Sequence, residues 1–222
     1  MILTHANKVF DLKDMFEAGT DSVFKAIEWA MAELIRHPHI MKEVQEEIRE
    51  IIKFKPKVEE NDLHKIQHSL QLVIKETLRL HPPTSLFTPR ESLENTKIQG
   101  YDIHAKTRVI INAWAIGRDP VSWEDPEEFW PKRFLNSTID YKGHDFELIP
   151  FGAGRRGCPG IMLAIATVEL ALANLLYQFD WSLPDGLSGQ KLDMSEIFGV
   201  TTNKKDPLVV IATPHERIIC KI

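Results

Sequence analysis

Cysteine is scarce in this sequence, and no long apolar run is present. Cys158 and Cys220 are the two cysteines among 222 residues, which is too few for a disulfide framework and typical of a protein from a reducing compartment. The most apolar stretch, 161–176, contains Glu169 and Asn174 and is shorter than the ~20 apolar residues that span a bilayer. We therefore expect a buried helix there, and neither a signal peptide nor a transmembrane segment.

The chain also lacks a basic excess. It carries 27 Lys and Arg against 32 Asp and Glu, a net charge of −5, so nothing in the charge balance indicates a nucleic-acid partner. With 43% hydrophobic and 27% charged residues, the composition is that of an ordinary globular protein.

Helical periodicity dominates the first third of the chain. Apolar residues recur every three or four positions, which predicts amphipathic helices. We expect Gly19 to weaken the first helix by ~1 kcal/mol and Pro38 to end it, because the residue before a proline avoids the helical region. The expected helices run over about 6–36, over about 39–52, and from a cap at Asn61 or Asp62 to His81.

The character of the chain changes after the double proline at 82–83. Short runs of β-branched and aromatic residues predict strands, and prolines interrupt a long irregular segment. A glycine-rich loop over 148–158 precedes a helix that Pro159 can start. The predicted fold class is therefore mainly α, or α+β, with small β pieces. The expected strands cover 97–101 and 107–111, and 200–202 is expected to form a hairpin with 208–212.

The glycine-rich loop contains the most informative residue, Cys158. A lone cysteine is more often a small buried hydrophobe than a ligand. Cys158, however, lies just before a predicted helix, where free amides and the helix dipole favour a thiolate, and Arg155 and Arg156 add positive charge. Glycines at 152, 154, 157 and 160 would let a flat ligand approach the backbone. A thiolate on such a platform is what haem-thiolate ligation requires.

The same glycines allow a second interpretation, a dinucleotide site. Gly152, Gly154 and Gly157 satisfy the pattern G-x-G-x-x-G. Asp180 follows at about the distance of a ribose-binding acid. The segment before the glycines ends in Pro150, however, which makes a poor central strand, and no alternation of strands and helices surrounds it. We therefore do not favour this interpretation.

A zinc site was the other alternative. His64 and His68 are four residues apart and could share a helix face. In the zinc-protease motif a glutamate follows the first histidine, but Lys65 occupies that place here. We expect this pair, and His37 with His39, to be exposed and inert.

The loop resembles the cysteine-ligand loop of the cytochrome P-450 family, which are haem-thiolate monooxygenases. The resemblance implies that haem b binds here with the Cys158 thiolate as axial iron ligand, and that Arg156 contacts a haem propionate. It also implies that Phe151, Gly152 and Gly160 lie against the cofactor. The family pattern F-x-x-G-x-R-x-C-x-G is matched at every defined position, by Phe151, Gly154, Arg156, Cys158 and Gly160.

Two further segments match the family's structural motifs. Glu76 and Arg79 form its E-x-x-R motif, and their spacing places them on one helix face. Arg133 lies in a segment similar to the family's F-x-P-E-R-F, with Lys132 in place of the glutamate. The resemblance implies a structural charge network of Glu76, Arg79 and Arg133 behind the haem. Because a planar guanidinium can hold a carboxylate through two hydrogen bonds, we expect the network to survive the change at 132.

The remaining matches concern oxygen chemistry and the propionates. The segment 18–22, A-G-T-D-S, resembles the oxygen-activation motif of the family's long distal helix, with serine in place of the usual threonine. Serine keeps the hydroxyl and loses the β-branch that fixes its rotamer. The resemblance implies that Asp21 and Ser22 are catalytic and relay protons. Arg90 matches an arginine that contacts a propionate in similar proteins, although an ordinary surface arginine fits nearly as well.

The resemblance covers about 9–215, and the sequence is similar to plant enzymes of specialised metabolism. It implies that 1–222 is part of a cytochrome P-450 domain, its C-terminal haem-binding half, without the N-terminal half and the membrane anchor. The implied function is insertion of one oxygen atom from O2 into an apolar small molecule, with electrons from an NADPH-dependent flavin reductase. The implied location of the full-length protein is the cytosolic face of the endoplasmic reticulum membrane. The alternatives are a relative that rearranges peroxides without a reductase, and a fragment that binds no haem.

Overall fold

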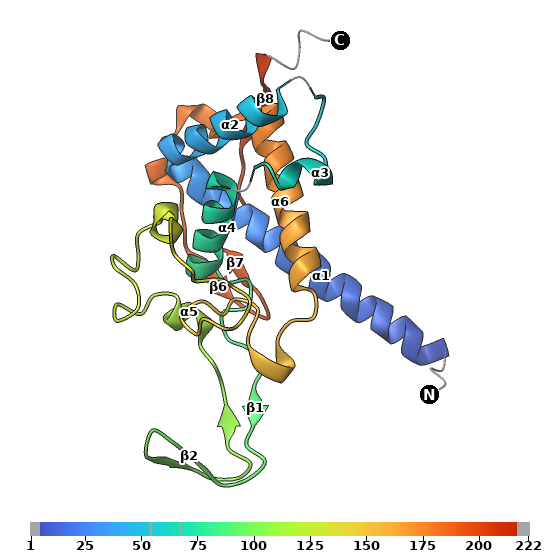
Figure 1. Ribbon diagram of the computed structural model, residues 1–222, viewed down its shortest axis with the longest axis vertical. Helices are drawn as coiled ribbons and strands as arrows, with labels where there is room; N and C mark the ends of the chain where they lie inside the picture. The colour runs from blue at the N-terminus through green and yellow to red at the C-terminus, as the bar shows by residue number, and fades with distance from the viewer. Residues whose placement is uncertain (1–4, 54, 67, 217–222) are drawn as a thin grey trace.

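Helices are the main regular secondary structure of the computed structural model, which describes residues 5–53, 55–66 and 68–216 (Figure 1). The prediction of a mainly α fold with small β pieces is confirmed. The α-helices are α1 (His5–Arg36), α2 (Pro38–Ile52), α3 (Glu60–Leu63), α4 (Ser69–Leu80), α5 (Ala113–Ile116) and α6 (Ile161–Gln178). The single-turn 3-10 segments are η1 (Pro131–Phe134), η2 (Gly154–Arg156), η3 (Pro184–Gly186) and η4 (Gly189–Lys191).

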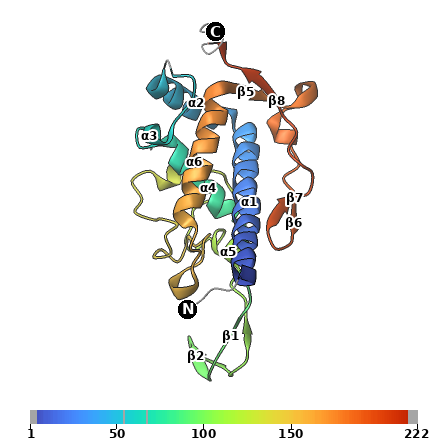
Figure 2. The same cartoon turned by 90° about the vertical axis from the view of Figure 1, so that its right-hand side faces the viewer.

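The strands form small antiparallel pairs in the described part of the chain. β1 (Arg90–Glu91) pairs with β4 (Arg108–Val109), and β2 (Thr96–Ile98) pairs with β3 (Tyr101–Ile103). β5 (Phe179–Ser182) pairs with β8 (Ile211–Pro214), and β6 (Glu196–Phe198) pairs with β7 (Thr202–Lys204). Figure 1 shows β1 and β2 in an arm that extends away from the helices, whereas Figure 2 shows the β6–β7 hairpin beside α1.

Four helices share one apolar core. α6 lies beside α1, and α2 and α4 contact both of them (Figure 2). Leu34, Ile48, Val73 and Leu172, one from each helix, are completely buried. Burying an aliphatic side chain of this size contributes about 1.5–3 kcal/mol, so the stripes that predicted the helices also hold them together. α6 is long and apolar enough to cross a membrane; one of its faces packs into this core, whereas Met162 and Leu163 near its start are exposed.

The junction of α1 and α2 follows from Pro38. α1 ends at Arg36 and α2 begins at Pro38, where the missing N–H and fixed φ of proline suit a first turn. α1 continues through Gly19, and nothing lies within 4 Å of the place where a side chain at this position would begin. The described side chains of 15–20 are exposed, and this end of α1 projects from the rest of the molecule (Figure 1).

The prediction of one helix from Asn61 or Asp62 to His81 is wrong, because the structure has two helices there, α3 and α4. Glu59 caps α3 in a capping box with Asp62, so Asp62 is not the cap that we predicted. Lys55 holds the buried Asp62 carboxylate at 2.8 Å. α3 then ends at Leu63, and α4 begins only at Ser69.

Two strand predictions are also wrong. The segment 97–101 is not one strand, because Gln99 and Gly100 have φ values of 49° and 89° and turn the chain between β2 and β3. The segments 200–202 and 208–212 do not pair with each other. β7 pairs with β6 instead, and β8 pairs with β5 at the end of α6. The turn residues predict where the chain bends, but the partner of a strand depends on which edge the helices place beside it.

Candidate functional site

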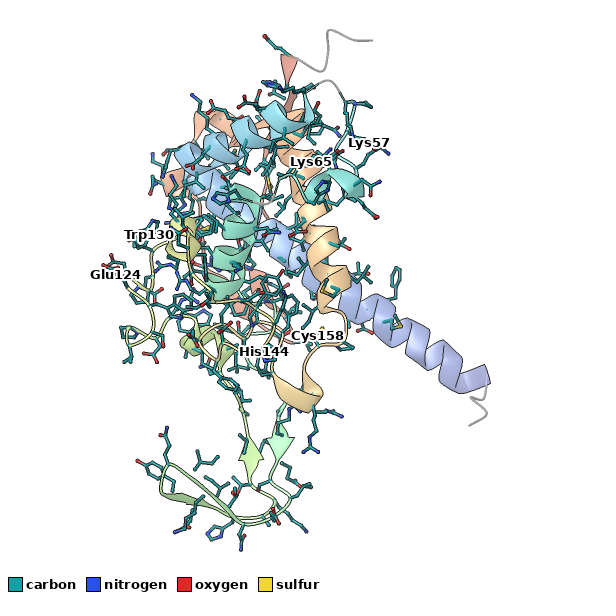
Figure 3. The ribbon with its side chains drawn as sticks, viewed as in Figure 1. Lys57, Lys65, Glu124, Trp130, His144 and Cys158 are labelled. Atoms are coloured by element: carbon teal, nitrogen blue, oxygen red, sulfur yellow. The ribbon has the colours of Figure 1, made fainter. Side chains whose placement is uncertain are left out.

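Cys158 lies in a tight loop that leads into α6. Its backbone N–H donates to the Phe151 carbonyl at 2.9 Å, and the Gly152 N–H donates to the Ile149 carbonyl at 2.9 Å. The Cys158 side chain is exposed. Figure 3 shows it just below the first turn of α6. The loop therefore presents the sulfur outward instead of burying it as a small apolar residue.

The glycines of this loop keep the approach to the sulfur open. Gly152 and Gly154 have φ values of 73° and 66°, in the left-handed region that favours glycine. A Cβ at Gly160 would lie 3.8 Å from the Cys158 sulfur, and a Cβ at Gly152 would lie 3.9 Å from the Phe87 ring. Larger side chains at these positions would fill the space beside the sulfur and against Phe87. The geometry therefore fits a flat ligand resting on backbone.

α1, α6 and the cysteine loop meet at a small cavity of about 30 Å³. Ser22 from α1, Phe151 from the loop and Ala164 from α6 all line it. The structure thus brings Ser22 into the neighbourhood of the cysteine loop, although the two are more than a hundred residues apart in the sequence. The Ser22 hydroxyl donates to the Ala18 carbonyl at 2.6 Å, within its own helix.

Asp21 and Ser22 are adjacent in sequence but have different surroundings. Asp21 is exposed, and its carboxylate accepts a hydrogen bond from the Thr201 hydroxyl at 2.6 Å. Thr201 lies in the turn between β6 and β7. Successive residues of a helix point about 100° apart, so Ser22 faces the cysteine loop while Asp21 meets the hairpin.

The two arginines that the resemblance assigns to the propionates have donors to offer. Arg156 is exposed at the end of η2, and Arg90 is half-buried in β1. The Arg90 Nε is buried and has no hydrogen-bond partner among the described residues. A buried N–H without a partner is costly, so this atom fits an anionic acceptor from a ligand.

The structure brings Glu76, Arg79 and Arg133 together. Arg79 donates to both oxygens of Glu76 at 2.8 Å, and Arg133 donates to Oε1 at 3.0 Å. The Trp130 N–H donates to the same oxygen at 2.7 Å. The side chains of Glu76 and Arg79 are completely buried, and that of Arg133 is nearly so. Burial and dense hydrogen bonding separate this cluster from an ordinary surface ion pair.

The two guanidinium groups also fasten the irregular segment between α5 and η1. Arg79 donates to the carbonyls of Gly117, Pro126 and Glu128, at 2.6, 2.7 and 3.0 Å. Arg133 donates to the carbonyl of Glu124 at 2.6 Å. The segment has little secondary structure of its own. The guanidinium groups therefore supply hydrogen bonds to carbonyls that would otherwise receive them within a helix or a sheet.

Lys132, which stands where a glutamate was expected, points away from this network. Its ammonium group pairs with Glu43 of α2 at 2.9 Å, and both side chains are about half exposed. The replacement therefore leaves the buried cluster intact and forms a surface ion pair of little energetic value.

Asp180, the candidate ribose ligand, has a different role. It lies in β5 and accepts hydrogen bonds from Arg49 at 2.9 Å and His215 at 3.0 Å. Partial burial alone would raise the pKa of Asp180, but the hydrogen bonds from His215 and Arg49 lower it below its ordinary value. The residues before Gly152 form a turn and not a strand. The arrangement does not support a dinucleotide site.

The two histidine pairs considered from the sequence differ in their surroundings. His64 and His68 are exposed and lie at the end of α3 and before α4, so they do not share a helix. Within the ranges that the structure describes, no three His, Cys, Asp or Glu side chains are arranged to hold a metal ion. The expectation that His37 is exposed is wrong, since it bonds the Glu33 carbonyl at 2.9 Å and stacks on Phe129.

A second polar cluster was not predicted from the sequence. The buried ring of His81 lies between the carboxylates of Glu33 and Glu196. The three residues line a cavity of about 780 Å³. One feature of the sequence could have indicated the cluster: Glu33 follows Trp29 by one helical turn and so lies on the same buried face of α1.

Comparison with known proteins agrees with these features. Cytochrome P450 71A1 from Persea americana is 59% identical over 202 residues, which are 91% of this chain and 40% of that protein. A 3-beta-hydroxylase from Tanacetum parthenium is 52% identical over 203 residues, which are 91% of this chain and 41% of that protein. The chain thus spans about two fifths of the length of these relatives, and the predicted similarity to plant members is confirmed.

A solved structure of a zebra fish cytochrome P450 with progesterone has the same fold. The TM-score is 0.78 at 30% identity, and the match covers 91% of this chain and 44% of the other. The sequence pattern that defines the family Cytochrome P450 matches residues 2–210. This chain belongs to the cytochrome P450 family.

Proposed function

We propose that this chain supplies the cysteine-ligand side of a haem-thiolate monooxygenase. The observation that carries the proposal is the exposed Cys158 sulfur on a loop whose glycines leave its approach free. A thiolate ligand needs access to an iron centre, and a porphyrin needs flat, unobstructed backbone. Both requirements fit the residues of this loop.

The residues around the loop fit haem b. Cys158 would be the axial ligand, with Phe151, Gly152 and Gly160 against the macrocycle. Arg156 and the unpartnered Nε of Arg90 would hold the propionates, because charge-assisted hydrogen bonds to carboxylates are the strong ones. When bound, the haem would supply dioxygen activation and redox chemistry, and the protein would supply ligation and orientation.

Proton delivery would come from α1. The Ser22 hydroxyl borders the cavity that it shares with Phe151, so it would be the last donor on the protein side. Its hydrogen would have to turn away from the Ala18 carbonyl to be passed on. Asp21 is exposed and would take protons from solvent. In this arrangement Asp21 would take up the proton and Ser22 would deliver it.

The reaction would insert one oxygen atom into an apolar small molecule. The relative from Tanacetum is named as a hydroxylase, and the zebra fish structure was solved with progesterone, which supports this class of substrate. Electrons would come from an NADPH-dependent flavin reductase, and the full-length protein would lie on the cytosolic face of the endoplasmic reticulum membrane. Oxygen- and NADPH-dependent turnover with added reductase would separate this reaction from a peroxide rearrangement.

Haem titration of the purified chain tests the ligand assignment. We expect a Soret band with the carbon-monoxide spectrum of a thiolate complex, and we expect Cys158→Ser to lose that spectrum. Cys220→Ser, which changes the other cysteine of the sequence, is the matched control and should keep it. A thiolate-type spectrum that persists in Cys158→Ser, or no Soret band in the unmodified chain, would overturn the proposal.

A further inference from the structure

The cluster of Glu33, His81 and Glu196 joins three elements of the fold. His81 follows α4, Glu33 belongs to α1, and Glu196 begins β6. His81 Nε2 lies 2.8 Å from Glu33 Oε1, and His81 Nδ1 lies 3.0 Å from Glu196 Oε1. The side chains are 6%, 3% and 11% exposed, so water does not compete freely for these bonds.

The two carboxylate contacts favour a ring with two N–H donors. An ionised carboxylate can only accept hydrogen bonds, and a neutral imidazole has one N–H and one bare nitrogen. Because both ring nitrogens of His81 face a carboxyl group, the ring that satisfies two ionised carboxylates is doubly protonated. Burial alone would raise the pKa of Glu33, but the hydrogen bond and charge of His81, with Arg36 and His37, lower it below its ordinary value.

One aromatic ring covers a face of His81, and a second holds its partner Glu196. The Trp29 ring stacks on His81, with centroids 4.1 Å apart and planes 1° from parallel. Trp114 donates its indole N–H to Glu196 at 2.9 Å. The face of an indole attracts a cation, and the extra donor holds Glu196 in place. The other charged groups that face the cluster are Arg36 and His37 beside Glu33, Lys204 over the Trp29 ring, and Arg118 with Glu127 across the cavity.

The β6–β7 hairpin is attached to this cluster at its base and to α1 at its tip. At the base, Glu196 bonds His81. Next to the turn, the Thr202 carbonyl accepts from the Trp29 indole of α1 at 3.2 Å, and the Thr202 N–H donates to the Pro83 carbonyl at 2.9 Å. At the tip, Thr201 donates to Asp21. The hairpin therefore reaches from a buried ion cluster to the exposed acid on the distal helix.

We propose that His81 is a positioning residue whose doubly protonated ring locks the β6–β7 hairpin to α1, so that loss of one ring proton releases the hairpin. A ring with a single N–H leaves one carboxylate facing a lone pair in a buried site, which is strongly unfavourable. Release at the base would also loosen the Thr201–Asp21 bond at the tip. The attachment of the hairpin is independent of haem. Because Asp21 is the proposed proton donor, an effect of the Thr201–Asp21 bond on proton delivery rests on the proposed function.

Hydrogen exchange of the purified 222-residue chain measures the lock. The backbone amides of 196–204 should be protected while NMR of labelled histidine reports two N–H groups on the His81 ring. As the pH is raised until one proton is lost, their exchange, corrected for the intrinsic pH dependence, should accelerate on the order of 100-fold. Protection that does not change when the ring changes its protonation state would overturn the proposal.

Matched variants assign the effect to the cluster. Glu196→Gln keeps the shape of the side chain and removes the charge, so the hairpin should exchange faster and without the pH step. His81→Gln should behave in the same way, whereas His104→Gln, at an exposed histidine, should keep the step. If Glu196→Gln keeps the step, the proposal is wrong. A failure of haem binding would leave this result unchanged, so the two proposals can fail separately.

Discussion

Glu76→Gln would test whether the buried charge network holds the fold together. The Glu76 carboxylate accepts hydrogen bonds from Arg79, Arg133 and the Trp130 N–H, and its side chain is completely buried. Glutamine keeps the volume but removes the charge and turns an NH₂ group toward a guanidinium. The buried guanidinium groups of Arg79 and Arg133 would then have lost the carboxylate that both of them contact.

The expected loss is large because the remaining charges cannot reach water. Removing one partner of a buried ion pair costs about 3–5 kcal/mol. Total stabilities of folded proteins are about 5–15 kcal/mol, so the variant would lose a large part of its margin. For a chain of this length, 1 kcal/mol lowers Tm by about 2–4 °C, which gives a decrease of roughly 6–20 °C.

Urea unfolding followed by circular dichroism and tryptophan fluorescence would measure the loss. Glu50→Gln makes the same chemical change at an exposed position of α2 and should change the unfolding free energy by no more than ~0.5 kcal/mol. If Glu76→Gln unfolds at the same urea concentration as Glu50→Gln, with an equal slope, the network does not stabilise the fold and the reasoning fails.

Three further substitutions probe other parts of the molecule. Gly160→Val would place a branched side chain against the Cys158 sulfur, from which a Cβ at 160 is 3.8 Å away, so haem titration should give at least ~10-fold weaker binding with unchanged circular dichroism; equal affinity would contradict the open-platform interpretation. Gly19→Ala has open space around it in α1 and should raise the unfolding free energy by ~0.5–1 kcal/mol in urea, and a less stable variant would contradict this. Burial would raise the pKa of Glu33, but the His81 hydrogen bond and nearby cations bring it below the ordinary value of 4.5, so its ionised form contributes stability above pH 4.5 that is lost as the pH falls further. The stability difference between the unmodified chain and Glu33→Gln should therefore shrink in acid unfolding series below pH 4.5, and a constant difference would refute the assignment.

Local signals in the sequence predicted the helices better than the strands. Pro38 marks the junction of α1 and α2 because its effect is confined to neighbouring residues. The short strands gave no comparable information, since β5 and β8 are separated by about 30 residues of sequence and their pairing depends on where α6 ends in the folded chain. The turn at Gln99 and Gly100 was missed because a run of strand-forming residues continues on both sides of it.

The candidate site could be predicted where a motif fixes side chains on one element. Glu76 and Arg79 share a helix turn, so their pairing follows from spacing alone, and Arg133 was assigned through the resemblance. The His81 cluster could not be found in this way. Its members are separated by 48 and 115 positions, and their contact depends on how α1, α4 and β6 pack.

Gly117 makes the charge network sensitive to a position that carries no charge. Its carbonyl accepts a bond from Arg79, and a Cβ on it would lie only 2.2 Å from the Arg79 carbonyl oxygen. Even a methyl group at 117 would therefore clash with the backbone of Arg79, whose side chain donates to the Gly117 carbonyl. An alanine at 117 would displace α4 and the irregular segment in opposite directions, and its damage would resemble that of a change at Arg79 itself.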